Sequence, residues 1–239
     1  MNTLKDSVVL VVGASSGMGA QIARTFAQEQ ARVVLAARNR EQLAQLAQEI
    51  GEQALAVPTD VQDADAVDHL ITTTLQEFGA IDILIYNTGT NIPDRSLEVL
   101  TDETWEMMLN TNLSGAFFCT KRVLPIMRKQ RHGLLIYIAS ACVKMPDVSG
   151  VAYQASKHGV VGLAHGTFQE EKQHGIRTSV IFPGLTDTPL VLKRPVPTPP
   201  EVVRQALQPQ DVADACLFIA QLPPRAYVPE LTLLPAGLA

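Results

Sequence analysis

Short apolar runs alternate along the chain with longer segments in which apolar residues recur at helical spacing. The first run, residues 8–12, is an unbroken series of valine and leucine. This pattern is typical of a strand that is buried on both faces of a parallel sheet. Seven strands are predicted in all, at residues 8–12, 32–37, 54–57, 81–86, 134–139, 178–182 and 231–234.

Predicted helices separate these strands. Residues 20–30, 63–78 and 211–220 are examples, and in the first two the apolar side chains recur three or four positions apart. Because β and α segments alternate from end to end, we expect an α/β fold, a doubly wound parallel sheet of Rossmann-like type. Helices would cover both faces in a three-layer sandwich. No repeat or boundary divides the chain, so a single domain, 1–239, should carry both the cofactor and the substrate sites.

The segment 101–130 reads as one long helix. Thr101 or Asp102 can serve as its N-cap, and Pro125 is expected to kink or shorten it. Asn112 stands among apolar neighbours in this helix and should face inward. A buried amide needs a hydrogen-bonding partner, which is either the backbone or a group of a functional site.

Composition and charge narrow the range of partners. Of 239 residues, 46% are hydrophobic and 18% are charged, which suits one compact domain with a sizeable core. Nineteen basic residues against twenty-four acidic ones give a net charge of -5, so no basic surface for nucleic acid is predicted. A small-molecule partner is expected instead.

Neither a targeting segment nor a metal site is predicted. The chain starts without a signal-peptide pattern and has no apolar run long enough to span a bilayer, so we expect a cytoplasmic protein that needs no membrane. Cys119, Cys142 and Cys216 are too few and too widely separated for a disulfide framework or a Cys-x-x-Cys metal site. They should be buried free thiols.

A glycine-rich turn follows the first strand and precedes a helix. Glycines at 13, 17 and 19 let the backbone approach a ligand closely, and the free N–H groups of the helix start favour an anion. An ordinary tight turn is the alternative, but the strand before it and the helix after it favour a dinucleotide pyrophosphate site. The candidate residues of this turn are Gly13, Ser15, Ser16, Gly17, Met18 and Gly19.

The end of the second strand bears on the choice of cofactor. An acid at this point would hold the ribose 2′-hydroxyl of NAD, but the chain has Ala37 followed by Arg38, Asn39 and Arg40. A guanidinium offers a fork of donors to a 2′-phosphate, so NADP(H) is favoured over NAD(H). The alternative is that the arginines only occupy a helix start, where a cation is slightly unfavourable.

The next strand ends also carry polar or small residues. Asp60, followed by Val61, would either meet the adenine edge or help to cap the next helix. Asn87 and Gly89 follow the fourth strand. Since the carboxyl ends of parallel strands meet at one edge of a sheet, these residues predict one ligand crevice.

A tyrosine and a lysine stand one helical turn apart at Tyr153 and Lys157. On a helix they share a face, so a phenol and an ammonium can point into one cleft. The spacing alone occurs by chance on many helices. Ser140, which ends the strand before them, and Asn112 supply further polar groups for the same site.

Prolines concentrate in the last quarter, where eleven of the fifteen lie at or after Pro183. Residues 193–200 cannot form a regular helix or a central strand. They form either a passive linker or a semi-rigid lid. Because they follow the strand end where the ligand should lie, we expect residues 189–208 to be a substrate lid.

Together these motifs resemble the short-chain dehydrogenase/reductase family over nearly the whole chain. The order and spacing of the matches are highly specific, although any one of them is weak. Val12 and Thr88 depart from the residues that are usual in the family. The matching residues are Gly13, Gly17, Gly19, Asp60, Asn87, Thr88, Gly89, Asn112, Ser140, Tyr153, Lys157, Pro183, Gly184 and Thr188. With the motifs above, the cofactor-binding set also includes Thr186.

The resemblance implies a hydride transfer between NADP(H) and a carbonyl or secondary alcohol. Tyr153 would be the general acid/base, and a nearby cation, Lys157, would favour its phenolate. By resemblance, Lys157 also bonds the nicotinamide ribose, Ser140 orients the substrate oxygen and Asn112 holds a water in the proton relay. The alternative is a catalytically silent dinucleotide-binding sensor or scaffold with the same fold.

Substrate identity lies beyond these motifs. The expected lining is mostly apolar, with Lys144 and Asp147 nearby, and fits a moderately hydrophobic carbonyl. A homotetramer or homodimer is what the resemblance implies. The expected lining residues are Ile92, Val143, Met145, Val148, Leu185, Leu190 and Val191.

Overall fold

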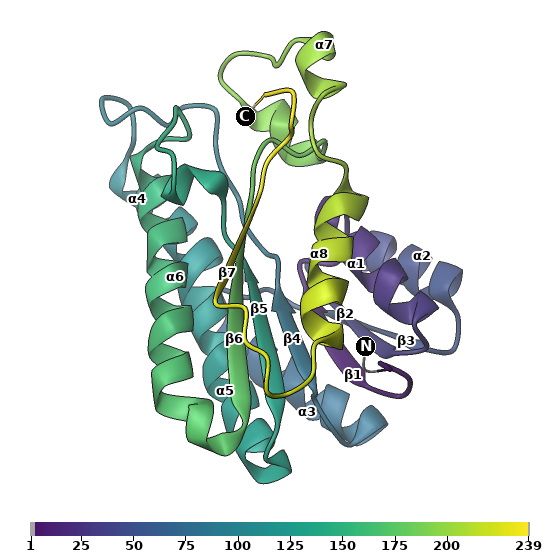
Figure 1. Cartoon of the computed structure of the whole chain (residues 1–239). Coiled ribbons are helices and arrows are strands. Elements are labelled where there is room, and N and C mark those ends of the chain that lie inside the picture. The colour runs from purple at the N-terminus through teal and green to yellow at the C-terminus, as the bar shows by residue number, and fades with distance from the viewer. Residues whose placement is uncertain (1–2, 239) are drawn as a thin grey trace.

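The computed structural model describes residues 3–238, and in it seven parallel strands form one sheet (Figure 1). Their order across the sheet is β3-β2-β1-β4-β5-β6-β7. All seven predicted strands are present, with bounds within two residues of those expected. The bounds are β1 (Val8–Val12), β2 (Arg32–Ala37), β3 (Ala54–Pro58), β4 (Ile83–Tyr86), β5 (Gly133–Ile138), β6 (Ile176–Pro183) and β7 (Glu230–Leu233).

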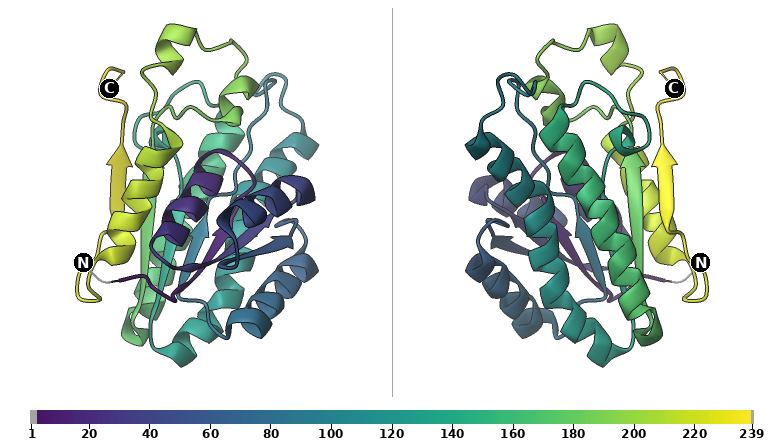
Figure 2. Two further views of the ribbon diagram at one scale, coloured as in Figure 1. Left: turned by 90° about the vertical axis from the view of Figure 1, so that its right-hand side faces the viewer. Right: turned by 90° about the vertical axis from the view of Figure 1, so that its left-hand side faces the viewer.

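Helices cover both faces of the sheet, which confirms the doubly wound, three-layer prediction. Helices α1, α2 and α8 pack on one face, and α3, α5 and α6 pack on the other, with α4 beside α6 (Figure 2). The helices are α1 (Gly17–Gln28), α2 (Arg40–Ile50), α3 (Ala64–Phe78), α4 (Asp102–Leu109), α5 (Gly115–Gln130), α6 (Val151–Glu171), α7 (Pro200–Val203) and α8 (Pro209–Gln221).

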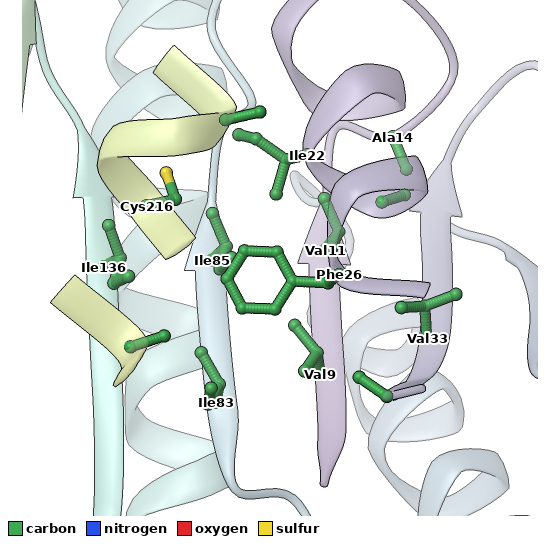
Figure 3. Close-up of a cluster of buried hydrophobic side chains, with 14 of the residues drawn as sticks. Val9, Val11, Ala14, Ile22, Phe26, Val33, Ile83, Ile85, Ile136 and Cys216 are labelled. Carbon is green, nitrogen blue, oxygen red and sulfur yellow. The ribbon is translucent and has the colours of Figure 1, made fainter. Parts of the chain in front are cut away.

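The unbroken apolar run of β1 has a direct explanation in the packing. Val9 and Val11 point into the core under α1 and α8, whereas Val8, Leu10 and Val12 point into the opposite core. In the first core the ring of Phe26 from α1 lies over the sheet beside Val9 and Val11 (Figure 3). Burying such a ring stabilises the fold by about 2–3 kcal/mol. Both faces of the central strand β1 are therefore buried from solvent.

The prediction of one uniform helix over 101–130 is wrong in its middle. Helix α4 ends at Leu109, a π-helical turn spans Asn110–Ser114, and α5 begins at Gly115. The hydroxyl of Tyr86 donates to the carbonyl of Thr111 at 2.6 Å, and this bond accompanies the widened turn. π-turns of this kind often mark functional sites.

The ends of this helical region match the expectation only in part. Thr101 is the N-cap of α4 and exchanges hydrogen bonds with Thr104. Pro125 lies inside α5 and does not end it. Pro125 and Lys121, whose carbonyl loses a partner to the proline, are both exposed, so water can satisfy that carbonyl.

The strand order changes direction between β1 and β4, and this topological switch point lies at the carboxyl edge of the sheet. The segment after β6 crosses above that edge, through a 3₁₀ turn at Pro189–Lys193 and then α7 (Figure 1). Residues 194–199 form neither helix nor strand, as their proline content predicts. Among residues 3–238, no helix is long and apolar enough to cross a membrane.

Candidate active site

The glycine-rich turn between β1 and α1 is tightly packed behind the switch point. Gly13 has a positive φ of 92°, and a Cβ there would lie 2.8 Å from the backbone nitrogen of Thr88. A Cβ on Gly19 would lie 2.0 Å from the carbonyl oxygen of Gly13. These two positions therefore require glycine, so that α1 can approach β1 and the turn can approach the end of β4.

The start of α1 leaves polar groups open toward a ligand. Ser16 is the N-cap of the helix, yet its side chain makes no capping hydrogen bond. Asn87 donates from Nδ2 to the carbonyl of Gly13 at 3.0 Å, while its buried Oδ1 has no hydrogen-bond partner within residues 3–238. Free N–H groups and the helix dipole favour a phosphate at this place.

A cleft of about 390 Å³ opens in front of this turn, and we call it the dinucleotide cleft. Most of the residues predicted to bind a cofactor line it. They are Gly13, Ser15, Ser16, Gly17, Met18, Arg38, Asn39, Asp60, Val61, Asn87, Gly89, Tyr153, Lys157 and Thr188. This lining fits a dinucleotide, because the phosphate end lies at a helix start and the far end reaches Tyr153 and Lys157.

Three predicted residues at the adenine end have separate tasks. Arg38 is exposed and lines the cleft. Asn39 caps α2 by accepting from the backbone of Gln42 at 3.0 Å. Arg40 is the first residue of α2 and does not line the cleft, so its assignment to the cofactor site is corrected. Asp60 is the only acid among the lining residues.

Asp60 does not cap the following helix, which was one of the two expectations. Its carboxylate accepts from the backbone of Gln62 at 3.0 Å, while Asp63 caps α3. Asp60 lines the dinucleotide cleft, and its contact with the adenine edge stays a prediction.

Tyr153 and Lys157 lie on the buried face of α6, as their spacing predicts. Tyr153 is 8% exposed and Lys157 is 3% exposed. The ammonium of Lys157 donates to the carbonyl of Ile138 at 2.9 Å and lies 5.7 Å from the centroid of the Tyr153 ring. The end of β5 therefore fixes the lysine beside the tyrosine.

Asn112 lies in the π-turn, and its amide is fully bonded. Its Oδ1 accepts from the backbone nitrogen of Thr90 at 2.7 Å, and its Nδ2 donates to the Thr90 carbonyl and to the Ser156 hydroxyl. Asn112 lines neither cleft of the site. It therefore holds the loop after β4 against α6, as expected for a buried amide that is bonded by the backbone. Its expected role of holding a water in the proton relay stays a prediction.

A second cleft, of about 420 Å³, adjoins the first, and we call it the substrate cleft. Ser140 lines it at the end of β5, where its hydroxyl accepts from the backbone of Cys142 at 3.3 Å. Tyr153 lines both clefts. The other residues shared by the two clefts are Met18, Ala139, Thr188 and Leu190.

The electrostatic surroundings of the pair suit proton transfer. Burial raises the pKa of Tyr153, nearby Cys142 adds to this, and a hydrogen bond with Ser140 and the charge of Arg95 oppose it. Tyr153 is therefore a neutral phenol, and hence a proton donor, near neutral pH. Burial lowers the pKa of Lys157 to about 8. Burial removes water from the ammonium and so disfavours its charged form, which predominates only at pH values below this pKa.

Lys157→Met is expected to change how stability depends on pH. Because the pKa of Lys157 falls from 10.5 to about 8 in the folded chain, only the unfolded chain holds this proton between those values. The unaltered protein should therefore gain stability relative to the variant as the pH rises from about 8 to 10.5. The difference between their free energies of unfolding should grow by up to about 3 kcal/mol. Urea unfolding of both proteins at either end of the window measures this, and a constant difference would contradict the lowered pKa.

Several predicted residues lie elsewhere than expected. Pro183, Gly184 and Thr186 line the substrate cleft and not the dinucleotide cleft. Gly19 lines neither, because it packs behind the turn against Gly13. The strand end that carries Pro183 points toward the substrate cleft, which spacing along the sequence does not reveal.

The predicted substrate lining is correct in part. Met145, Leu185, Leu190, Val191 and Asp147 line the cleft. The others do not, as Val148 is 86% exposed and Lys144 pairs with Glu230 at 2.6 Å. The remaining residues predicted to line the cleft but absent from it are Ile92 and Val143.

Some lining residues had no signal in the sequence. Thr90 and Lys193 line the dinucleotide cleft, and the ammonium of Lys193 donates to the Thr90 hydroxyl at 3.2 Å. Arg95 and Arg194 line the substrate cleft. Both arginines lie in irregular segments, where no periodicity shows which way a side chain points. The cysteine prediction is confirmed, since all three thiols are free and buried.

Comparison with known proteins agrees with this geometry. A family model described as short chain dehydrogenase matches residues 7–195. An uncharacterised oxidoreductase from Staphylococcus aureus (strain USA300) is 35% identical over 236 residues, which cover 98% of this chain and 100% of the relative.

Two solved structures extend the comparison to the cofactor. A 3-ketoacyl-(acyl-carrier-protein) reductase from Brucella melitensis, complexed with NADH, has a TM-score of 0.90 at 26% identity over 98% of both chains. A metagenomic short-chain oxidoreductase in complex with NADP has a TM-score of 0.85 at 30% identity over 98% of this chain and 99% of that one. This chain is therefore an oxidoreductase that belongs to the short chain dehydrogenase family.

Proposed function

We propose that the protein transfers a hydride between NADP(H) and the carbonyl or secondary alcohol of a small molecule, with Tyr153 as the general acid/base. One observation carries this proposal: Tyr153 lies where the dinucleotide cleft and the substrate cleft meet. A proton donor at that junction is within reach of a substrate oxygen while the substrate faces the cofactor cleft.

In the direction of reduction, the neutral phenol of Tyr153 gives its proton to the carbonyl oxygen. Ser140, which lines the substrate cleft together with Tyr153, holds that oxygen in place. In the direction of oxidation, Tyr153 accepts the proton of the alcohol, and the ammonium of Lys157 favours the phenolate. Bound NADP(H) supplies or accepts the hydride.

The chain's own residues support NADP(H) as the preferred cofactor. Arg38 lines the adenine end of the cleft, and no acid follows β2 at the position where NAD-binding proteins hold the ribose. The 2′-phosphate of NADP would gain a charge-assisted bond from this guanidinium. The solved relatives include one complex with NADH and one with NADP, so family membership alone does not decide the preference.

Arg38→Asp is expected to reverse the cofactor preference. The carboxylate would repel the 2′-phosphate and accept from a ribose hydroxyl, so the KM for NADPH should rise about ten- to a hundredfold relative to that for NADH. Arg40→Asp is the matched control, because Arg40 is exposed at the first position of α2 and lies outside the cleft. Tighter binding of NADH than NADPH by the unaltered protein would overturn the preference.

The reaction class itself is tested by a substrate panel. Purified protein with NADPH or NADH should reduce some ketones or aldehydes and, with the oxidised cofactors, oxidise some secondary alcohols. Turnover by none of them would favour a silent dinucleotide-binding sensor. The oxidoreductase relatives do not favour that alternative.

The segment after β6 is proposed to act as a substrate lid, and the protein is proposed to be an oligomer. The proposed substrate lid is residues 189–208, and its first part borders both clefts: Pro189, Leu190 and Lys193 line the dinucleotide cleft, and Leu190, Val191 and Arg194 line the substrate cleft. The contact of Lys193 with Thr90 would hold the lid closed. A cytoplasmic homotetramer or homodimer is proposed from the family resemblance. Light scattering on the purified protein measures the assembly directly.

A further inference from the structure

The substrate cleft contains charged groups that the proposed reaction does not use. Its walls are largely apolar, with Met145, Leu185 and Leu190 among the lining residues. Arg95, Arg194 and Asp147 also line it. Two arginines and one aspartate leave a net charge of +1 in a cleft that otherwise suits an apolar molecule.

Arg95 is a buried residue whose guanidinium makes no ion pair within residues 3–238. It is 7% exposed and is the only arginine among the buried residues of the described chain. Its Nε is buried and has no hydrogen-bond partner among residues 3–238. By contrast, the partly buried Arg177 donates to the carbonyl of Ala226 at 2.7 Å. A buried charge of this kind is costly unless a partner binds to it.

The surroundings of Arg95 do not supply that partner. Asp147 is exposed, its carboxylate accepts from the backbone of Ser149 at 2.9 Å, and it makes no ion pair with Arg95. Burial lowers the pKa of Arg95, and Arg194 adds to this effect, while Asp147 and Tyr153 oppose it without reversing it. A guanidinium stays charged in proteins. No carboxylate of residues 3–238 lies within ion-pair distance of Arg95, so within the described chain its charge has no directly paired counter-ion.

The backbone holds Arg95 in a fixed place relative to Tyr153. Gly150 has a φ of 88°, and a Cβ on it would lie 2.8 Å from the carbonyl oxygen of Arg95 and 2.9 Å from its Cβ. The amide of Asn91 donates to the carbonyl of Ser149 at 2.9 Å and ties the same two loops together. Helix α6 starts directly after Gly150 and carries Tyr153 in its first turn.

We propose that Arg95, with Arg194, binds a carboxylate of the substrate, so that the substrates are oxo acids and the corresponding hydroxy acids. The proposal rests on the proposed function. A single carboxylate balances the net charge of +1 and matches the planar fork of a guanidinium. The apolar walls contact the carbon chain between the acid group and the carbonyl at Tyr153.

The test compares oxo acids with their methyl esters at the same carbon skeleton, for example acetoacetate and levulinate. With NADPH, kcat/KM for the preferred acid should exceed that for its ester about ten- to a hundredfold. Arg95→Gln should remove this preference through a higher KM for the acid, with the ester unaffected. Arg95→Lys should restore part of it. The exposed Arg225→Gln should behave as the unaltered protein.

Stability and turnover separate the possible outcomes. Arg95→Gln removes an unpaired buried charge, so its melting temperature should not fall, whereas loss of a structural ion pair would lower it. Equal use of acids and esters by the unaltered protein, or an equal loss of both in Arg95→Gln, overturns the inference and leaves the proposed function standing. No reduction of any acid or ester, nor of any ketone in the wider panel, overturns both.

Discussion

Tyr153→Phe is expected to lower kcat for carbonyl reduction by about a hundred- to ten thousandfold while NADPH binding is retained. The variant removes one oxygen, the group that lies at the junction of the two clefts. The ring still fills its buried place on α6, and the glycine-rich turn is untouched. Kinetics with the best ketone of the panel, together with NADPH fluorescence titration, measures the two effects separately.

Tyr227→Phe is the matched control for this experiment. Tyr227 stacks on Phe168 with ring centroids 4.0 Å apart and lines neither cleft. Its loss of a hydroxyl should leave turnover within about twofold of the unaltered protein, as is usual for changes away from a site. If Tyr153→Phe turned over at the same rate as Tyr227→Phe, the proton would come from another group.

Gly19→Ala is expected to abolish dinucleotide binding and to destabilise the fold. The added Cβ would lie 2.0 Å from the carbonyl oxygen of Gly13, which is backbone and cannot rotate away, and 2.6 Å from Asn87 Nδ2. Helix α1 would have to move off β1, and its N-terminus would leave the phosphate position. Overpacking of this kind costs about 1–3 kcal/mol or more.

Gly162→Ala provides the comparison at a harmless position. Gly162 lies in α6, and a Cβ there would meet no atom within 4 Å. Since alanine is the better helix former, this variant should be unchanged or more stable by about 0.5–1 kcal/mol. Thermal unfolding of both variants measures their stability, and NADPH titration measures their dinucleotide binding. Normal NADPH binding by Gly19→Ala would refute the packing argument.

Much of the fold could be predicted because burial leaves a strong trace in the sequence. The run at β1 has no polar position since Val8, Leu10 and Val12 enter one core while Val9 and Val11 enter the other. The apolar spacing over residues 101–130 wrongly predicted one uniform helix. The π-turn spans only five residues, Asn110–Ser114, so it leaves little trace in the apolar spacing of the segment. The hydrogen bond that accompanies it comes from Tyr86, which lies far away in the sequence.

Some residues of the candidate site could be predicted from the sequence and others could not. Residues that follow a strand, such as Gly13, Asn87 and Ser140, could be placed from the sequence because parallel strands end at a common edge. Arg95 could not, because its loop has no period and its position depends on the backbone of Gly150. The arginine that we propose to bind the substrate carboxylate can therefore be located only from the tertiary packing.

The most direct test of the central claim follows the hydride itself. NADPH that carries deuterium at both positions of the hydride-donating carbon of the nicotinamide would be incubated with the protein and the best ketone of the panel, and the alcohol would be analysed by mass spectrometry. We expect one deuterium on the carbinol carbon with the unaltered protein and almost no labelled alcohol with Tyr153→Phe. Failure of the unaltered protein to form a labelled alcohol, while NADPH still binds, would contradict the central claim.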